Sequence, residues 1–521
     1  MKPFAATIVL LLAVLLVAEG SARDLTEVEY AHALDLIMAG RHADAVAQLD
    51  SLSGTCAGQP LYLLARARVM LEALPLDDDD KTLTKTLSTP ILSDLDRVID
   101  WCDDAMDDSG DPLYRYYRGW AWMTKSQIKA VGRDFYGAGR DAGKGKGDLE
   151  TYLERDSIAP IPNGLIGAYL YFTDAVPKLF QFLSKLLFLP TGDRDRGLEM
   201  IAQAATGDSP ARVDYEVLDA NITFFFEGRV EDGLAKSNGL LERYPRYPRL
   251  GLASAMAAPL DPYRAIAHME RASGVLDGLK GMAGLDSASL ETLRVTQGLA
   301  LRVVAGHRAA LDVFLPTATE PPPHPDWAGP FARLQVAQVL AMDGRRDEAR
   351  EFTWQVLNDE DGERFQDLAR RMMDDLKEDS SGQRDPVEDA WIAALYDGDP
   401  QAGPLFEEHA ATSLRAAFYA AEALLLSGDQ RGALNEFRDV HDREARAWEK
   451  IYTMLAAARV AEIQAARGHW RGAANWMERA AEDHQEIYRM QWLLQGRGRY
   501  FEELGENPGA WPAPTLMPVA P

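Results

Sequence analysis

The sequence predicts an all-α protein assembled from repeated pairs of antiparallel helices. Apolar residues recur with helical spacing from Arg23 onward, and alternating apolar and polar runs rich in β-branched residues are nearly absent. A glycine followed by a short polar turn also recurs between the helical stretches. With 521 residues, the chain is much longer than one typical core, which favours several domains or an extended repeat array.

The repeated marker combines a glycine that ends one helix with a small residue five positions later in the next helix. The instances are Gly40 with Ala45, Gly228 with Gly233, Gly344 with Ala349, Gly428 with Ala433 and Gly468 with Ala473, and Gly306 is a degraded sixth case. A small residue also lies seven positions before the glycine, at Ala33, Ala337, Ala421 and Ala461. Glycine supplies the left-handed cap of the first helix, and the small residues let the two helices pack closely.

This pattern resembles the tetratricopeptide repeat (TPR), which has small residues at its helix crossing and a glycine between its helices. The spacings of 38 residues from Gly306 to Gly344 and of 40 from Gly428 to Gly468 exceed the ~34 residues of that repeat. We therefore expect a TPR-like α-solenoid with elongated helices. Stacked helix pairs of this kind leave a concave surface on which a protein or peptide partner can lie.

Breaks in the pattern divide the chain into segments. We expect a signal peptide (1–22), N-terminal TPR-like helices (23–110), a family-defining helical core (111–200), further TPR-like helices (201–315), a Pro-rich linker (316–330), C-terminal TPR-like helices (331–505) and a disordered Pro-rich tail (506–521). Within the N-terminal segment, a helix pair is expected over 60–73 and 91–106. Clustered prolines in the linker and the tail prevent a continuous helix there.

The N-terminus has the features of an export signal. Lys2 precedes an apolar run from Ile8 to Ala18, and Gly20 and Ala22 fit a cleavage site after Ala22. The run is shorter than the ~20 residues of a spanning helix, so a retained membrane anchor is the less favoured alternative. We expect the mature protein in the periplasm or cell envelope of a bacterium.

The formal net charge is −26, and removal of residues 1–22 leaves it unchanged. Such an acidic surface repels phosphate backbones, so nucleic acid is a poor candidate partner. The two cysteines, Cys56 and Cys102, could pair in an exported protein or remain buried thiols. Motifs for metal binding or catalysis are missing, so we expect no catalytic residue, metal or cofactor.

Residues 111–200 interrupt the glycine marker and hold a basic stripe. Read as one helix, the segment places its cations at helical spacings on a single face, with Gly137 beside them. The cations are Lys125, Lys129, Arg133, Arg140 and Lys144. A phosphate-binding loop ending at Lys144 would need glycine at position 138 and serine or threonine at position 145, and the chain has Ala138 and Gly145.

Aromatic residues precede the stripe, at Tyr114, Tyr117, Trp120 and Trp122. Aromatic and basic anchors dominate many protein interfaces, so these aromatics and the stripe together form the candidate partner-binding face. The alternative is that the stripe pairs with the protein's own acidic helices.

The most apolar part of the mature chain runs from Leu165 to Pro190. Lys178 and Lys185 argue against a simple membrane span, and Pro177 starts a second helix. The apolar face of that helix comprises Leu179, Phe180, Phe182, Leu183, Leu186 and Leu187. A buried core helix is the favoured interpretation, and a groove for lipid or contact with a membrane surface is the alternative.

The turn after this helix carries a more specific resemblance. The run Asp174-Ala175-Val176-Pro177-Lys178, followed by Gly192-Asp193-Arg194-Asp195-Arg196-Gly197-Leu198, resembles a segment of uncharacterised exported bacterial TPR proteins. It is also similar to a segment of the eukaryotic tetratricopeptide repeat protein 39 and inclusion-body-clearance family. The resemblance covers residues 111–200 and implies a non-enzymatic α-solenoid scaffold, with membrane or lipid-body association in the eukaryotic branch.

Structural roles are expected for the residues of this turn, which are Gly192, Asp193, Arg194 and Gly197. Gly192 caps the apolar helix, Asp193 caps the next helix, and Arg194 or Arg196 bonds the exposed carbonyl groups. Ligand binding by the two arginines is the alternative.

These observations favour a non-enzymatic protein-interaction scaffold or adaptor of the cell envelope. The alternative is a lipid- or apolar-ligand-binding protein that uses residues 165–190. A glycan-processing enzyme on a helical toroid ranks third, because no paired carboxylates stand in a recognisable motif.

Overall fold

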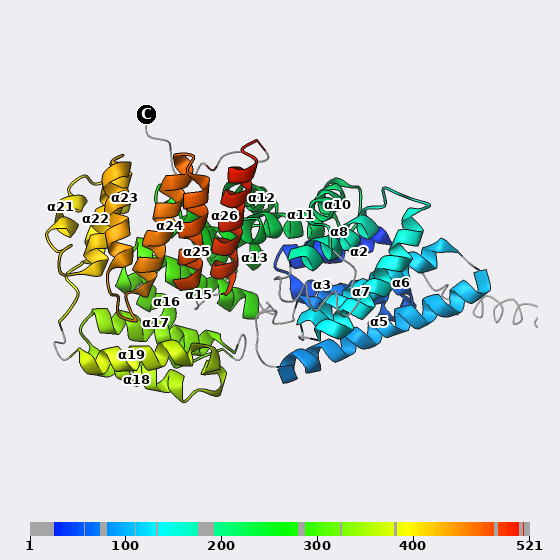
Figure 1. Cartoon of the computed structure of the whole chain (residues 1–521). Helices are drawn as coiled ribbons and strands as arrows, with labels where there is room; N and C mark the ends of the chain where they lie inside the picture. The colour runs from blue at the N-terminus through cyan, green and yellow to red at the C-terminus, as the bar shows by residue number, and fades with distance from the viewer. Residues whose placement is uncertain are drawn as a thin grey trace, which may run out of the picture. The chain divides into compact units, whose positions relative to one another are not determined.

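The computed structural model describes residues 26–56, 58–72, 81–109, 111–131, 134–175, 192–279, 287–322, 326–379, 383–483, 488–509 and 514. Every regular element in these ranges is a helix, which confirms the all-α prediction (Figure 1). The chain forms two compact units, unit 1 up to Tyr215 and unit 2 from Glu216. The expected signal peptide and most of the Pro-rich tail lie outside the described residues.

Unit 1 is a series of helices in which successive members pack on each other. They are α2 (Glu27–Met38), α3 (His42–Cys56), α4 (Pro60–Leu71), α5 (Lys81–Ser109), α6 (Pro112–Val131), α7 (Phe135–Leu153), α8 (Pro160–Ala175) and α10 (Arg194–Thr206), and α11 (Arg212–Asn221) crosses the unit boundary. The helix expected over 91–106 begins earlier, at Lys81, and continues through Pro90. Arg68 of α4 ties down α11, because its Nη2 donates to Asp214 Oδ1 at 2.7 Å and its Nε to Asp214 Oδ2 at 3.1 Å.

The two cysteines of unit 1 do not pair. Cys56 and Cys102 are both buried free thiols. Burial raises the pKa of Cys102 to about 12, so its reactive thiolate form is scarce at neutral pH. A structural role for this thiol follows.

Unit 2 continues the helical array. Its elements are η1 (Ile222–Phe226), α12 (Val230–Arg243), α13 (Pro248–Ala257), α14 (Ala265–Leu279), α15 (Ser287–Val304), α16 (His307–Thr319), α17 (Ala328–Met342), α18 (Arg346–Leu357), η2 (Glu360–Phe365), α19 (Gln366–Glu378), α20 (Asp389–Tyr396), α21 (Ala402–Glu407), α22 (Leu414–Leu426), α23 (Gln430–Asp442), α24 (Lys450–Ala466), α25 (Trp470–Asp483) and α26 (Tyr488–Glu506). α16 continues through Pro316 to Thr319, so it enters the segment expected as a linker.

The predicted glycine caps are confirmed. Gly40, Gly228, Gly306, Gly344, Gly428 and Gly468 all have positive φ, between 61° and 94°. The small residues expected at the helix crossings are buried, including Ala33, Ala349, Ala433 and Ala473. The sequence pattern did not predict the cap at Gly398, which has a φ of 84° and lies between α20 and α21. Its marker was incomplete, because Gly403 follows five positions later but Trp391 occupies the small position before it. The fold is a TPR-like array of antiparallel helix pairs.

Several helices of unit 2 are buried around nearly their whole circumference. In α24 every residue from Tyr452 to Ala465 is buried, and in α13 and α17 nearly every residue is buried. A helix that is buried on all sides has protein on all sides. These helices therefore lie inside unit 2 and present no face to a partner.

Buried arginines connect these inner helices. Arg459 of α24 donates from Nε to Glu422 Oε1 of α22 at 2.5 Å, and Arg497 of α26 donates from Nε to Glu462 Oε1 of α24 at 2.8 Å. Arg302 of α15 donates to Gln338 of α17. We call these three contacts the arginine ladder.

The acceptors of the arginine ladder share one position in the repeat. Gln338, Glu422 and Glu462 each lie six residues before the glycine that ends the pair's turn, at Gly344, Gly428 and Gly468. Six residues before the other four capping glycines, Gly40, Gly228, Gly306 and Gly398, the residue is apolar. The ladder therefore belongs to three of the helix pairs and not to every repeat.

Each ladder arginine also binds a backbone carbonyl group far away in the sequence. Arg459 donates to the oxygens of Pro259 and Leu260 at 2.8 Å each, Arg302 to Trp448 O at 2.6 Å, and Arg497 to Gly228 O at 2.9 Å. These bonds satisfy carbonyl groups that the helices leave unpaired at their ends.

Burial raises the pKa of Glu422 and of Glu462, although the arginine beside each one lowers it. The desolvation cost is therefore large, and the carboxylates depend on their arginines to stay ionised.

The last helix of unit 2 returns to its first turn. α26 packs on η1, where Trp492 stacks on Phe226 with 5.4 Å between ring centroids. A Cβ added at Gly228 would lie 2.1 Å from Arg497 N, and one added at Gly496 would lie 2.7 Å from Phe226 O. Glycine is required on both sides of this contact, which closes unit 2 on itself.

The arginine ladder gives a stability prediction. Replacing Arg459 with methionine leaves Glu422 without a cation in the core, and we expect a loss of about 3–5 kcal/mol in the free energy of unfolding. The double variant Arg459→Met with Glu422→Leu should recover part of that loss, because it removes the unpaired carboxylate but leaves the carbonyl groups of Pro259 and Leu260 without their donor. Urea denaturation followed by circular dichroism measures both.

The matched control is Arg345→Met, which breaks the exposed pair of Arg345 and Glu348. It should leave the urea midpoint unchanged, because exposed ion pairs contribute little. An equal effect of Arg345→Met and Arg459→Met would contradict the structural role of the ladder.

Candidate partner-binding surfaces

The predicted basic stripe does not lie on one helix. The segment folds into two antiparallel helices, α6 and α7, and the second begins after Asp134. The Asp134 side chain accepts a hydrogen bond from Gly137 N at 2.9 Å and caps α7. The single-helix prediction was wrong because this aspartate favours a helix start in the middle of the stripe. Arg133 lies outside the described residues.

Two lysines of the stripe form ion pairs inside unit 1. Lys125 pairs with Asp96 of α5, and Lys129 pairs with Asp141 of α7, whose carboxylate is fully buried. The side chains of the two lysines are 13% and 17% exposed. Of the two interpretations of the stripe, pairing with the protein's own acidic helices therefore describes these two lysines.

The other two described cations of the stripe reach the surface. Arg140 is exposed and contacts Asp141 at 3.2 Å. Lys144 is exposed, and its Nζ lies 4.0 Å from the ring centroid of Trp122. This cation–π contact lies on the pair of α6 and α7.

The predicted aromatic anchors mostly pack within unit 1. Trp120 is buried, and its ring lies 5.4 Å from that of Tyr30 on α2. Tyr114 packs edge-on against Trp101 at 5.1 Å, and Tyr117 packs against Tyr116 at the same distance. Trp120 belongs to the core, while Tyr114, Tyr117 and Trp122 are half-buried.

The described half of the apolar segment is a core helix. In α8, Leu165, Ile166 and Leu170 are buried, and α8 packs along α10. The candidate groove residues Leu179, Phe180, Phe182, Leu183, Leu186 and Leu187 lie outside the described residues. Across the described part of the chain, no helix combines the length and apolar character that a membrane span requires.

At the turn before α10, the predicted cap by Asp193 is confirmed, whereas the apolar helix that Gly192 was expected to cap lies outside the described residues. The side chain of Asp193 accepts a hydrogen bond from Arg196 N at 3.1 Å and caps α10, as predicted. A Cβ added at Gly192 would lie 2.3 Å from Asp174 N, so only glycine fits there. At Gly197 an added Cβ would lie 2.8 Å from Gly167 O, so this glycine sets the close crossing of α8 and α10. Arg194 lies near Asp195, with 3.8 Å between Nη1 and Oδ1.

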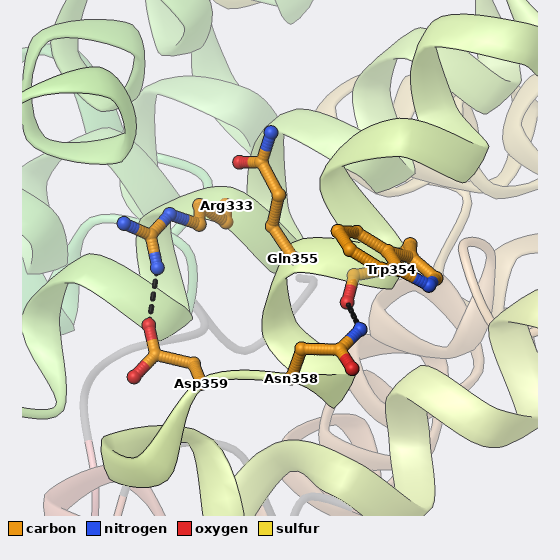
Figure 2. Close-up of a pocket in the computed structure, with 5 residues that line it drawn as sticks. All are labelled: Arg333, Trp354, Gln355, Asn358 and Asp359. Atoms are coloured by element: carbon orange, nitrogen blue, oxygen red, sulfur yellow. Dashed lines mark hydrogen bonds and ion pairs between the residues drawn. The ribbon is translucent and has the colours of Figure 1, made fainter.

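Unit 2 offers a hollow that the sequence reading did not identify. It has a volume of about 450 Å³ and is lined by Arg333, Trp354, Gln355, Asn358 and Asp359 (Figure 2). We call it the Trp354 hollow. Arg333 comes from α17, Trp354 and Gln355 from the last turn of α18, and the other two residues from the turn that follows α18.

The hollow is held in place by local hydrogen bonds. Arg333 pairs with Asp359, and its Nε donates to Ala318 O at 3.1 Å. Asn358 Nδ2 donates to Trp354 O at 2.7 Å and so binds the end of α18 (Figure 2). Trp354 itself is 56% exposed, which is unusual for tryptophan. A large aromatic surface is thus presented on a fixed frame.

Periodicity could have indicated this tryptophan. The buried residues of α18 are Ala349, Thr353 and Val356, at spacings of four and three. Trp354 lies off that face, so a pattern-based search for aromatic residues on the polar side of a helix would have found it.

Comparisons with known proteins add little. No protein-family model and no curated protein matches the sequence. One solved structure that resembles the chain is described as "Human IFIT1 dimer with PPP-AAAA". It is 15% identical, with a TM-score of 0.33, and the match covers 80% of this chain and 93% of that chain. This likeness is too distant to bear on function.

Two glycines of α7 provide a test of the α6–α7 crossing. A Cβ added at Gly145 would lie 2.8 Å from Met123 Cγ and 2.9 Å from Gly119 O, whereas an added Cβ at Gly143 meets nothing within 4 Å. We expect Gly145→Ala to lower the melting temperature of unit 1. The control Gly143→Ala should raise its free energy of unfolding by roughly 0.5–1 kcal/mol, because alanine favours helix. Calorimetry of the full chain measures both, and two changes of the same sign would contradict the close crossing.

Proposed function

We propose that the protein is a non-enzymatic interaction scaffold of the cell envelope, and that the Trp354 hollow is where it holds a partner protein. The observation that carries this proposal is an exposed tryptophan on a rigid helical frame. Tryptophan and arginine are the residues most enriched at the energetic centres of protein interfaces. The hollow has both, in Trp354 and Arg333.

The hydrogen bonds around the hollow support the proposal, because side chains that are already held in place lose less conformational entropy when a partner binds. Asn358 and the ion pair of Arg333 with Asp359 fix the walls before any partner arrives. A preformed site loses less conformational entropy on association than a flexible one. Because α17 and α24 are buried, contact with a partner falls to helices that have an exposed face, such as α18.

Location and partner class are further parts of the proposal. The apolar run after Lys2 favours export with cleavage after Ala22, and sequencing the N-terminus of the purified protein should then begin at Arg23.

The net charge of −26 favours a protein partner over nucleic acid. The resemblance of residues 111–200 to exported TPR proteins and to the tetratricopeptide repeat protein 39 family agrees with a scaffold.

The alternative of an apolar-ligand or lipid-binding protein has less support. The described half of its segment, α8, is occupied by packing against α10. The proposed scaffold therefore remains the better account of the described residues.

Photo-crosslinking in the native cell tests the scaffold function. A photoreactive phenylalanine analogue at position 355 lies in the wall of the hollow. It should capture a defined partner, identified by mass spectrometry, and adding Trp354→Ala should abolish the capture because the aromatic anchor is lost.

The control places the same analogue at Asn435, an exposed residue on α23 in the same unit. Capture of the same proteins from both positions, or capture that survives Trp354→Ala, would contradict a binding role for the hollow.

A further inference from the structure

The polar groups around Trp354 are not evenly balanced between donors and acceptors. Gln355 Nε2 donates to Glu351 Oε1 at 3.1 Å, and Asn358 Nδ2 donates to Trp354 O at 2.7 Å. Both side-chain amides therefore use an N–H group within the protein. Among the described residues no donor bonds to the side-chain oxygen of Gln355 or of Asn358, so both oxygens remain available as acceptors.

The one cation of the hollow is already engaged. Arg333 pairs with Asp359 and donates to Ala318 O, and its side chain is only 15% exposed. Together with Glu351, which receives the Gln355 bond, the charged groups in and beside the hollow have a net charge of −1. The hollow does not offer a free positive charge to an anionic ligand.

The position of the hollow at the C-terminal end of α18 adds negative electrostatic potential. Trp354 and Gln355 belong to the last turn of the helix, where carbonyl groups point outward and the helix dipole is negative. α18 has acidic residues in its first turn, Asp347 and Glu348, but no basic residue in its last turn. Its C-terminal end therefore lacks the cation that commonly neutralises a helix end.

We infer that the Trp354 hollow binds the guanidinium group of an arginine on the partner protein, an inference that rests on the proposed scaffold function. The planar guanidinium stacks on the indole face of Trp354, whose π-system attracts cations. Its N–H groups point to the oxygens of Gln355 and Asn358. The charge of −26 on the whole chain steers such a basic segment to the surface.

Arginine fits this site better than other side chains. Lysine supplies the charge but not the flat donor group, so it binds more weakly. Citrulline has nearly the same shape but no charge, so it loses both the attraction to the indole and the attraction to the helix end. A glutamate side chain is repelled.

The test uses the full mature chain labelled with 5-fluorotryptophan and followed by ¹⁹F NMR. The chain has 11 tryptophans, and the variant Trp354→Phe identifies the resonance of Trp354. The probes are four peptides of the form acetyl-Gly-Gly-Xaa-Gly-Gly-amide, with arginine, lysine, citrulline or glutamate at the centre. We expect a saturable shift with arginine, weaker binding of lysine, and binding of citrulline weaker by about fivefold or more.

Two variants complete the test. Gln355→Lys should weaken binding of the arginine peptide by about fivefold, because it introduces a cation and removes an acceptor. The control Asn435→Lys adds the same charge on exposed α23 and should change nothing. Equal binding of the arginine and citrulline peptides, or preference for the glutamate peptide, would overturn the inference.

The two proposals fail separately. A partner captured from position 355 without any effect of the arginine peptide would leave the scaffold function standing and remove the arginine. Binding of the arginine peptide without a captured partner would do the reverse.

Discussion

The arginine ladder constrains the whole of unit 2. Arg302, Arg459 and Arg497 are fully buried, and a buried guanidinium is costly unless its N–H groups are bonded and its charge is balanced. Arg459 and Arg497 find carboxylates in Glu422 and Glu462. Arg302 donates to the side-chain oxygens of Gln335 and Gln338, and all three arginines also reach a backbone carbonyl group far away in the sequence. The helices that supply these groups must therefore stay together. The contact of Arg497 with Gly228 extends the same rule to the end of the chain, where α26 docks on η1.

Under the proposed scaffold function, burial limits where a partner can bind. An open solenoid offers the faces of its inner helices, but α17 and α24 are covered on all sides by the chain's own residues. In unit 1, Lys125 and Lys129 form ion pairs with aspartates of neighbouring helices. These two cations are therefore paired within unit 1, which agrees with an acidic exterior that attracts basic partners. The outer helix α18, with Trp354, is then the natural place for recognition.

The sequence predicted those features that depend on local chemistry. The glycine caps follow from backbone conformation alone, and the cap at Asp193 follows from one carboxylate at a helix start. Features that depend on neighbours in space were missed. The stripe from Lys125 to Lys144 was predicted on one helix because the cap at Asp134 was not weighed against the periodicity.

The arginine ladder also depends on neighbours in space and could not be predicted from the sequence. Arginine is rarely fully buried, so no single arginine in the sequence suggests a core position. The only signal in the sequence is that Gln338, Glu422 and Glu462 each lie six residues before a capping glycine. The equivalent position is apolar before the other four capping glycines, so this partial recurrence does not identify the arginines that bind there. The Trp354 hollow likewise depends on three separate elements that only the fold brings together.

Hydrogen exchange of the full chain, resolved by mass spectrometry, tests most directly whether unit 2 is one closed and cooperative body. If the ladder closes the unit, the amides of α26 exchange as slowly as those of α24, and Arg497→Met accelerates exchange in α26 and in η1 together. Fast exchange throughout α26 while α22 to α25 remain protected would show that the last helix is not part of the closed unit and would contradict the account.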